Sequence, residues 1–327
     1  MTLPLALTMG EPAGIGGELT LLAWLKRGKE GLPPFFALDD PARLERLAAS
    51  LGWTVPLRVI AEPAEAVAVF PEALPVLPVA LATRVTPGRP DASNAPAVLR
   101  AITTAVSLVK ACRAAALVTN PIQKKLLYSA GFRHAGHTEF LAELAGGAAP
   151  AMMLVCPGLR VVPVTIHLAL RDAVAALSRE TIVAAGRITA AGLVRDFAIP
   201  GPRLAVAALN PHAGEDGALG REEIEIIAPA IAAAREAGID VSGPYGCDTM
   251  FHKQGADAFV VMLHDQGHIA AKLVAPNGAA AFAIGSPILF SSVAHGSAFN
   301  IAGKGVASPA ALIEAIARMA GVGGPTL

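Results

Sequence analysis

The sequence is poor in the residues that mark several classes of protein. Only 5% of its 327 residues are aromatic and 16% are charged, and Lys+Arg and Asp+Glu are equal at 26 each. A net charge near zero offers no basic face of the kind that nucleic-acid-binding proteins use. The three cysteines, Cys112, Cys156 and Cys247, lie far apart and form no CxxC pair. This pattern indicates free thiols in a reducing compartment rather than disulfides.

Signals for export and for membrane insertion are also missing. The first basic residue is Lys26, so the N-terminus lacks the positive region of a signal peptide. The longest stretch without Asp, Glu, Lys or Arg, residues 273–303, carries two prolines and four serines. A membrane span needs about 20 predominantly apolar residues in helix-compatible sequence. We therefore expect a cytoplasmic protein without a membrane span.

Apolar sequence is abundant and falls into alternating strand-like and helical runs. With 54% apolar residues, the chain is long enough for one or two domains. Strand-like runs such as FFALD, AAALVTN and ADAFVVML alternate with helical runs such as PARLERLAASLG and SRETIVAAGRITAAGLVRDF. The alternation predicts a mainly parallel sheet covered by helices on both faces. MMLVC and LRVVPVTIH are separated by Pro-Gly and predict a hairpin.

The expected architecture is an α/β protein with two α/β/α lobes and a cleft between them. We expect the first lobe to comprise residues 1–130 plus about 300–327, and the second to comprise about 131–299. The second lobe would carry the histidines described next. No repeat or low-complexity tract marks a boundary between the lobes.

Histidines follow three of the predicted strands. His167 ends the run VVPVTIH, His212 follows RLAVAAL by a few residues, and His264 directly follows ADAFVVML. The carboxyl ends of strands border the ligand crevice of an open α/β sheet, so three imidazoles could converge there. Neutral imidazoles with open coordination positions suit Zn²⁺ or a similar divalent ion. Three unrelated loop histidines are the alternative.

Other polar residues lie near these histidines or at helix starts. Asp265 adjoins His264 and could orient its ring. If HIAAKL is helical, Lys272 lies about two turns beyond His264 and could point into the crevice; an exposed surface lysine is the alternative. His137 and Thr138 of GHTEF precede a helical run, where Thr138 could cap the helix and His137 could donate to an anionic substrate.

A glycine-rich turn, GEPAGIGGE at residues 10–18, joins the first predicted strand to the first helix. It fits neither the GxGxxG nor the Walker A spacing. Helix N-termini favour anions, which makes Gly14 and Gly16 candidate cofactor contacts. Tight turns also need glycine for purely structural reasons, and the sequence leaves both readings open.

Taken together, TMGEPAGIGGEL, TNPIQKK, GHTEFLAEL, TIHLALRD, LNPHAGEDGALGREE, DTMF and HDQG resemble the 4-hydroxythreonine-4-phosphate dehydrogenase family. These stretches follow the family order from residue 8 to about residue 272, and LNPHAGE and HDQG are the most specific. The resemblance implies a fold like that of isocitrate and isopropylmalate dehydrogenases. It also implies a homodimer with the active site at the subunit interface, NAD or NADP as cofactor, and a divalent metal (zinc, magnesium or cobalt).

The same resemblance implies roles for individual residues. The implied metal ligands are His167, His212 and His264, the substrate contacts are His137, Thr138 and Lys272, and the catalytic candidates are Lys272, His137 and Asp248. The implied reaction is NAD(P)-linked oxidation of a secondary alcohol, converting 4-phosphohydroxy-L-threonine to 3-amino-2-oxopropyl phosphate with loss of CO₂. This step belongs to pyridoxal phosphate (pyridoxine) biosynthesis.

One segment departs from the family pattern. Ala281 and Phe290 stand where the family has a substrate-contacting asparagine and arginine, and Ala294 replaces an aspartate. An arginine holds phosphate through charge-assisted bonds worth roughly 1.5–3 kcal/mol each, and phenylalanine offers none. The alternative is the same chemistry on a different hydroxy acid or diol carboxylate, such as an unphosphorylated one. Gly17 also replaces the usual proline of the family.

Two further alternatives use the same histidines without hydride transfer. One is a metal-dependent hydrolase or isomerase, and the other is a non-catalytic relative that binds a ligand. The presence of all three histidines together with His137 and Lys272 favours a working enzyme.

Overall fold

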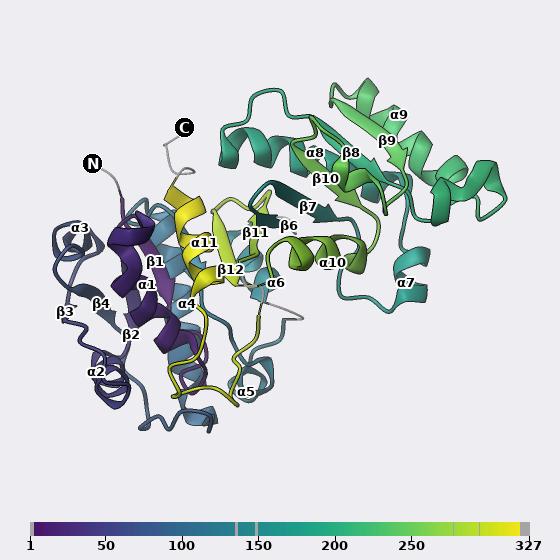
Figure 1. Ribbon diagram of the computed structural model, residues 1–327. Coiled ribbons are helices and arrows are strands. Elements are labelled where there is room, and N and C mark those ends of the chain that lie inside the picture. The colour runs from purple at the N-terminus through teal and green to yellow at the C-terminus, as the bar shows by residue number, and fades with distance from the viewer. Residues whose placement is uncertain (1–2, 135–136, 148–149, 277, 294, 321–327) are drawn as a thin grey trace. The chain divides into compact units, whose positions relative to one another are not determined.

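The computed structural model describes residues 3–134, 137–147, 150–276, 278–293 and 295–320, and the chain divides into two compact units (Figure 1). Unit 1 comprises Met1–Ala149 and Ser286–Gly323, and unit 2 comprises Pro150–Gly285. Both units combine a β-sheet with helices, which confirms the predicted α/β class with two lobes.

The boundaries between the units differ from the expected ones. Residues 131–149 and 286–299 belong to unit 1 rather than to the second lobe. The reason is that both segments pack on elements of unit 1. α6 (His137–Ala145) packs against α4 (Ala95–Lys110), and β12 (Phe290–Val293) pairs with β5 (Leu117–Thr119).

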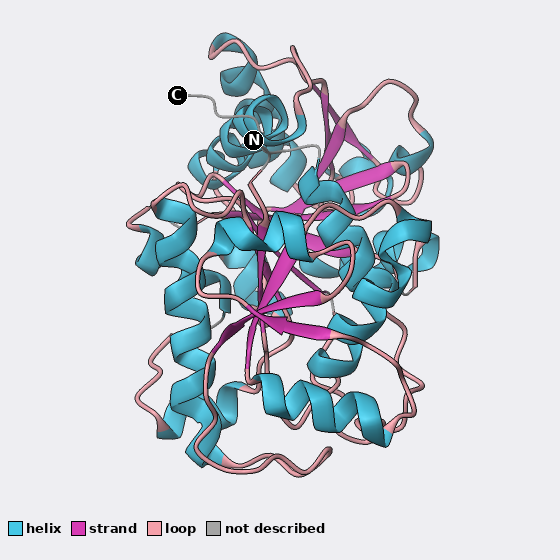
Figure 2. Ribbon diagram, turned by 90° about the vertical axis from the view of Figure 1, so that its left-hand side faces the viewer, coloured by secondary structure: helices cyan, strands magenta, loops and turns pink. Residues whose placement is uncertain are grey.

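Unit 1 is built on strands in the order β3-β4-β2-β1-β5-β12, and the pairings recorded among them are parallel. Its other strands are β1 (Leu5–Thr8), β2 (Phe35–Asp39), β3 (Leu57–Val59) and β4 (Leu74–Pro78). Its other helices are α1 (Gly16–Glu30), α2 (Pro41–Ser50), α3 (Ala66–Val69), α5 (Lys124–Ser129) and α11 (Ala310–Ala320). Figure 2 shows helices flanking the strands.

Local sequence accounts for these elements. All five residues of β2 are buried, as expected for a parallel strand covered on both faces. α2 begins at Pro41, whose missing N–H is not needed at the first helical position. The backbone N–H of Arg43 donates to the side chain of Asp40 at 2.9 Å, and this N-cap is worth about 1 kcal/mol.

Unit 2 contains a mixed sheet with the strand order β11-β6-β7-β10-β8-β9. Its strands are β6 (Ala151–Cys156), β7 (Leu159–Pro163), β8 (Leu204–Ala207), β9 (Val241–Tyr245), β10 (Ala258–Val261) and β11 (Ala280–Ile284). β7, β10, β8 and β9 are parallel to one another, whereas β6 pairs antiparallel with β7 and β11. The antiparallel β6–β7 pair is the predicted hairpin, and Gly158 in its turn has a φ of 76°.

The helices of unit 2 pack on this sheet around an apolar core. They are α7 (Leu170–Ala175), α8 (Arg179–Phe197), α9 (Ala228–Glu236) and α10 (His264–Val274). Leu154, Val161, Val261 and Ala271 belong to one buried cluster, which anchors α10 to β6, β7 and β10. Burying a leucine or valine contributes about 1.5–3 kcal/mol. No helix in the described part of the chain is long and apolar enough to cross a membrane.

Candidate active site

Two of the three expected metal ligands lie together at the carboxyl ends of neighbouring strands in unit 2. β7 and β10 are parallel partners, and the ring centroids of His167 and His264, which follow them, are 5.9 Å apart. Both side chains line a cavity of about 250 Å³ together with Thr165, Leu263 and Asp265. The convergence of these two imidazoles follows from the strand order.

His167 does not end a strand, contrary to the sequence-based expectation. β7 ends at Pro163, and His167 has a left-handed φ of 39°. The intervening residues are tied to the end of β10: the N–H of Val164 donates to the carbonyl of Val261 at 2.8 Å, and the hydroxyl of Thr165 donates to that of Met262 at 2.7 Å. These bonds carry His167 alongside His264.

His268 packs against His264, which the sequence analysis did not predict. Its ring stacks on that of His264 at 3.5 Å between centroids, and its Nδ1 lies 3.0 Å from the carbonyl oxygen of His264. Burial, together with nearby positive charge, lowers the pKa of His268 to about 4, so this ring is neutral at neutral pH. The spacing HDQGH was the available signal, because residues four apart share a helix face.

Gln266 of the HDQG motif connects α10 to β8. Its Oε1 accepts the N–H groups of Met262 and Leu263 at 2.9 and 3.1 Å, which completes the start of the helix. Its Nε2 donates to the carbonyl of Ala208, directly after β8, at 3.0 Å. One amide therefore fixes the helix that begins at His264 against the end of a neighbouring strand.

His212 lies in a left-handed turn, Pro211–Gly217, which follows β8. His212, Ala213, Glu215 and Asp216 have φ values of 51°, 55°, 42° and 53°. Left-handed helical geometry costs roughly 1–2 kcal/mol for each residue that is not glycine. Such a turn persists only where its surroundings determine its conformation, and clusters of this kind are typical of functional sites.

Carboxylates orient two of the histidines in the same way. The Nδ1 of His212 lies 2.7 Å from Glu215 Oε1, and the Nδ1 of His264 lies 2.7 Å from Asp265 Oδ1. The bond to Glu215, and secondarily the charge of Asp248, raises the pKa of His212. A carboxylate on one ring nitrogen leaves the other nitrogen free to bind a metal, which is the usual support for histidine ligands.

The fit of a divalent ion is therefore partial within one chain. His167 and His264 offer suitable imidazoles close together, and His212 is oriented like a ligand. Over the described ranges, however, no three His, Cys, Asp or Glu side chains form a group that could hold a metal ion.

The remaining predicted site residues are placed as follows. Lys272 is exposed on α10, close enough to His268 for its charge to contribute to the lowered pKa of that ring. Asp248 is exposed in the turn after β9 and acts on His212. α6 begins at His137, so Thr138 lies in its first turn, and the side chains of both lie outside the described residues.

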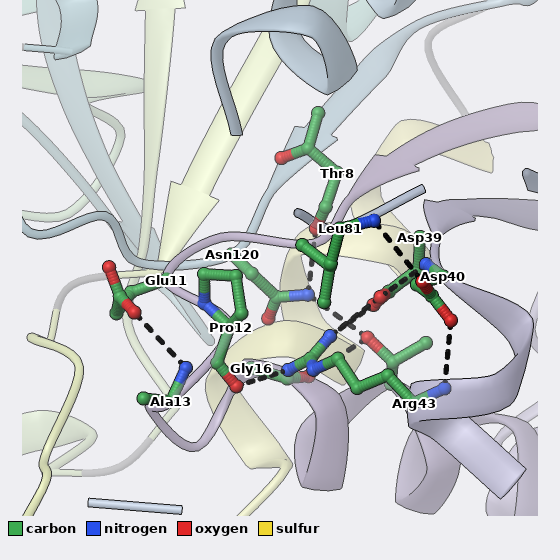
Figure 3. Close-up of polar contacts among 11 residues, drawn as sticks. Thr8, Glu11, Pro12, Ala13, Gly16, Asp39, Asp40, Arg43, Leu81 and Asn120 are labelled. Carbon is green, nitrogen blue, oxygen red and sulfur yellow. Dashed lines mark hydrogen bonds and ion pairs between the residues drawn. The ribbon is translucent and has the colours of Figure 1, made fainter. Parts of the chain in front are cut away.

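The glycine-rich turn of unit 1 is tied to its own surroundings (Figure 3). Glu11 Oε1 accepts the N–H of Ala13 at 3.1 Å, and Arg43 Nη2 donates to the carbonyl of Pro12 at 2.8 Å. Arg43 Nη1 also donates to both carboxylate oxygens of Asp39, at 2.7 and 2.6 Å. This buried ion pair holds the turn against the start of α2.

Gly14 and Gly16 are required by close packing. A Cβ on Gly14 would lie 2.7 Å from the carbonyl oxygen of Ser297, and one on Gly16 would lie 2.8 Å from that of Met9. Close packing is a sufficient reason for glycine at both positions. Their contact with a cofactor stays a prediction.

The departures from the family pattern fall on two strands. Phe290 begins β12 with 3% of its surface exposed and pairs with Leu117 of β5. Ala281 lies in β11, opposite Leu154 of β6. Phe290 is thus a core residue rather than a contact for a ligand, and Ala294 lies outside the described residues.

Two α/β units, with two imidazoles close together at the carboxyl ends of parallel strands, define an α/β protein of the kind that carries its functional residues at those strand ends. Residues 32–319 match the family model of the pyridoxal phosphate biosynthetic protein PdxA. The chain belongs to this family, and it is an oxidoreductase.

Relatives of known name agree with this membership. The chain is 51% identical to the 4-hydroxythreonine-4-phosphate dehydrogenase of Bradyrhizobium diazoefficiens, with 96% of this chain and 95% of that protein covered. A crystal structure of the Klebsiella pneumoniae enzyme of the same name has 34% identity and a TM-score of 0.87, covering 98% and 99% of the two chains. A terephthalate 1,2-cis-dihydrodiol dehydrogenase from Burkholderia xenovorans LB400 has 32% identity and a TM-score of 0.67, covering 98% of each chain. The family resemblance expected from the sequence is confirmed.

Proposed function

We propose that the protein oxidises the secondary alcohol of 4-phosphohydroxy-L-threonine with NAD or NADP, yielding 3-amino-2-oxopropyl phosphate and CO₂ for pyridoxal phosphate biosynthesis. The observation that carries the proposal is the pair His167 and His264, 5.9 Å apart at strand ends, in a chain 51% identical to a dehydrogenase named for this substrate. We place the reaction in the cytoplasm, because the three free thiols suit a reducing compartment.

The proposed metal ligands are His167, His212 and His264, and imidazole ligands favour zinc or cobalt over magnesium, which prefers oxygen ligands. A bound ion would polarise the substrate hydroxyl and stabilise the alkoxide that develops. The chain prepares its own groups for this role: Asp265 holds the His264 ring through Nδ1, and the neutral His268 supports the same ring by stacking.

Removal of the hydroxyl proton needs a base within hydrogen-bond reach of the substrate. We propose Lys272 or His137 for this step, with Asp248 as a third candidate. Lys272 lies on the helix that begins at His264, and its spacing of four residues from His268 and eight from His264 supports a position on the same helix face. Asp248 acts on His212.

We propose that a second copy of the chain completes the site and that the three imidazoles are drawn from two copies. Exposed apolar side chains lie close in sequence to His167 and His264: Leu168 and Leu170 follow His167, and Ile269, Leu273 and Val274 lie on α10. Leu273, which follows Lys272 in the sequence, is 77% exposed. Exposed apolar patches mark protein contacts, and a homodimer would cover this one while supplying the missing ligand.

We place the nicotinamide cofactor at the carboxyl edge of the unit 1 sheet, beside the turn that carries Gly14 and Gly16. Three buried oxygen atoms here have no hydrogen-bond partner in the described part of the chain, namely Thr8 Oγ1, Asn120 Oδ1 and Ser297 Oγ. Buried polar atoms are normally satisfied, so these atoms fit a ligand that supplies hydrogen bonds. When bound there, NAD or NADP would supply the acceptor for the hydride that leaves the substrate carbon.

Phe290 leaves the substrate phosphate without the arginine of the family. We propose that His137 and Thr138 bind the phosphate instead, because α6 begins at His137 and helix N-termini favour anions.

The test is turnover by the purified protein with Zn²⁺, Co²⁺ or Mg²⁺ and NAD or NADP, followed by the absorbance of the reduced nicotinamide. The substrates are hydroxy acids offered with and without phosphate. Turnover of 4-phosphohydroxy-L-threonine alone is the expected result. Turnover of unphosphorylated substrates only would overturn the substrate assignment, and absence of any reduced cofactor would overturn the dehydrogenase reaction.

A further inference from the structure

We infer that Glu223 is a positioning residue for His212: its carboxylate holds the left-handed turn that presents this imidazole. The inference rests on the proposed function, in which His212 is a metal ligand. His212 has left-handed backbone angles, so neither a regular helix nor a strand fixes the position of this imidazole.

Three hydrogen bonds converge on Glu223 from the start of the turn. Its Oε1 accepts the backbone N–H groups of Leu209 and Asn210, both at 2.8 Å. Its Oε2 accepts the side-chain amide of Asn210 at 2.9 Å. Hydrogen bonds to a charged acceptor are stronger than neutral ones. The chain leaving β8 is therefore fixed just before Pro211 and His212.

The far side of the turn closes over the same carboxylate. A Cβ on Gly214 would lie 2.6 Å from Glu223 Oε2, so the backbone of Gly214 passes directly against this oxygen. Asn210 is held a second time by Glu222, whose Oε2 accepts its amide at 2.7 Å. Glu223 thus touches the turn both before and after His212, which is how one side chain can determine a run of left-handed residues.

Glu223 is itself firmly anchored. Glu223 is only 5% exposed and begins a π-helical turn, Glu223–Ile227, that leads into α9. Ile227 at the end of this turn is fully buried, and α9 packs against α8 and β9. Single π-helical turns occur frequently at functional sites. The core of unit 2 therefore fixes the carboxylate, and the carboxylate in turn fixes the exposed turn.

A purely structural carboxylate would differ in one measurable respect. Its removal would weaken the fold, whereas removal of a positioning residue weakens the ligand that it positions. Partners that orient metal ligands typically change metal affinity by about 10–100-fold when they are removed. Zinc affinity and local protection of the turn, measured on the same variants, therefore separate the two roles.

The experiment compares wild type, Glu223→Ala, Glu223→Gln, His212→Ala and the control Glu225→Gln. Glu225 is an exposed carboxylate two residues away that pairs with Arg221. Hydrogen exchange is followed over residues 209–217, and zinc alone is titrated by calorimetry. Glu223→Ala should exchange about tenfold faster in this segment and bind zinc about 10–100-fold more weakly, while the control behaves as wild type.

Glu223→Gln keeps an oxygen for the two backbone N–H groups but cannot accept the amide of Asn210 at its nitrogen, so an intermediate loss of zinc affinity is expected. This variant also serves if Glu223→Ala does not fold. Wild-type exchange, or faster exchange with wild-type zinc affinity, in the Glu223 variants would overturn the positioning role. Wild-type zinc affinity in His212→Ala would overturn the proposed function, and the positioning role with it. If His212→Ala loses zinc affinity and the Glu223 variants do not, the positioning role alone is overturned.

Discussion

Gly17 shows how tightly single residues are constrained around the glycine-rich turn. A Cβ at this position would lie 2.8 Å from Leu47 Cδ2 and 2.9 Å from Arg43 Nη2. Arg43 is not free to move, because its guanidinium is bonded to Asp39 and to Pro12. The glycine that replaces the family's proline therefore accommodates a buried ion pair that packs directly against the first turn of α1.

Gly17→Ala should destabilise the protein by about 1–3 kcal/mol, the usual cost of an overpacked core. The control is Gly28→Ala in the same helix, where an added Cβ meets nothing within 4 Å. This control should stabilise the protein by roughly 0.5–1 kcal/mol, because alanine is the better helix former. Urea unfolding of both variants measures the difference, and stabilisation by both would refute the constraint at Gly17.

Cys247 and Cys112 should differ in reactivity. Burial, with a contribution from Asp248, raises the pKa of Cys247 to about 11, whereas Cys112 is exposed. The thiolate is the reactive form, and only about 0.1% of Cys247 is in this form at pH 8, so its alkylation rate should rise about tenfold per pH unit up to about pH 11. Alkylation with iodoacetamide, followed by peptide mass spectrometry, should modify Cys112 first. Equal rates at pH 8 would contradict this expectation.

Among the secondary-structure elements, those with strong patterns were predictable. Runs such as FFALD and ADAFVVML became β2 and β10, and the Pro-Gly hairpin became β6–β7. β9 escaped prediction because its sequence VSGPY contains Gly243 and Pro244, which break strand patterns. The left-handed turn at His212 escaped because its bonds come from Glu223, 13 residues beyond Asn210, and local propensity does not reveal such a partner.

The start of α10 depends on one side chain, which can be tested. Gln266 accepts two backbone N–H groups and donates to Ala208, so Gln266→Ala removes all three bonds and leaves buried groups unsatisfied. The expected loss is about 1–3 kcal/mol in the free energy of unfolding. Gln254→Ala, at an exposed glutamine, should change stability by less than about 0.5 kcal/mol. Chemical denaturation compares the two, and equal stabilities would rule out the capping role.

At the scale of the whole molecule, the division into units was predictable but its boundaries were not. The chain passes between the units at 149–150 and 285–286, and neither crossing carries a change of composition that distinguishes one unit from the other. The pairing of β12 with β5 spans more than half of the chain, and only the folded structure reveals such a contact. The three histidines could be assigned to one lobe from sequence, but which of them lie together in the folded chain could not.

The proposed dimer makes a prediction about the exposed apolar patch of unit 2. Leu273→Asp places a charge in this patch and should weaken self-association at least about tenfold, since desolvating an unpaired charge is costly. Val194→Asp, on the exposed face of α8, is the matched control, because Val194 is also exposed and lies in another element. Sedimentation velocity over a range of concentrations measures both. A Leu273→Asp protein that associates like wild type would place the subunit contact elsewhere.

If His212 and His264 of one site come from different copies, two inactive variants should restore each other. A mixed dimer of His212→Ala and His264→Ala chains has one site with both substitutions and one site with neither. Random reassociation makes about half of the dimers mixed, so activity should recover to about a quarter of the wild-type value. Each variant reassociated with itself is the control and should stay inactive. Because His167 and His264 already lie 5.9 Å apart in one chain, a lack of recovery would mean that His212 reaches them within that same chain.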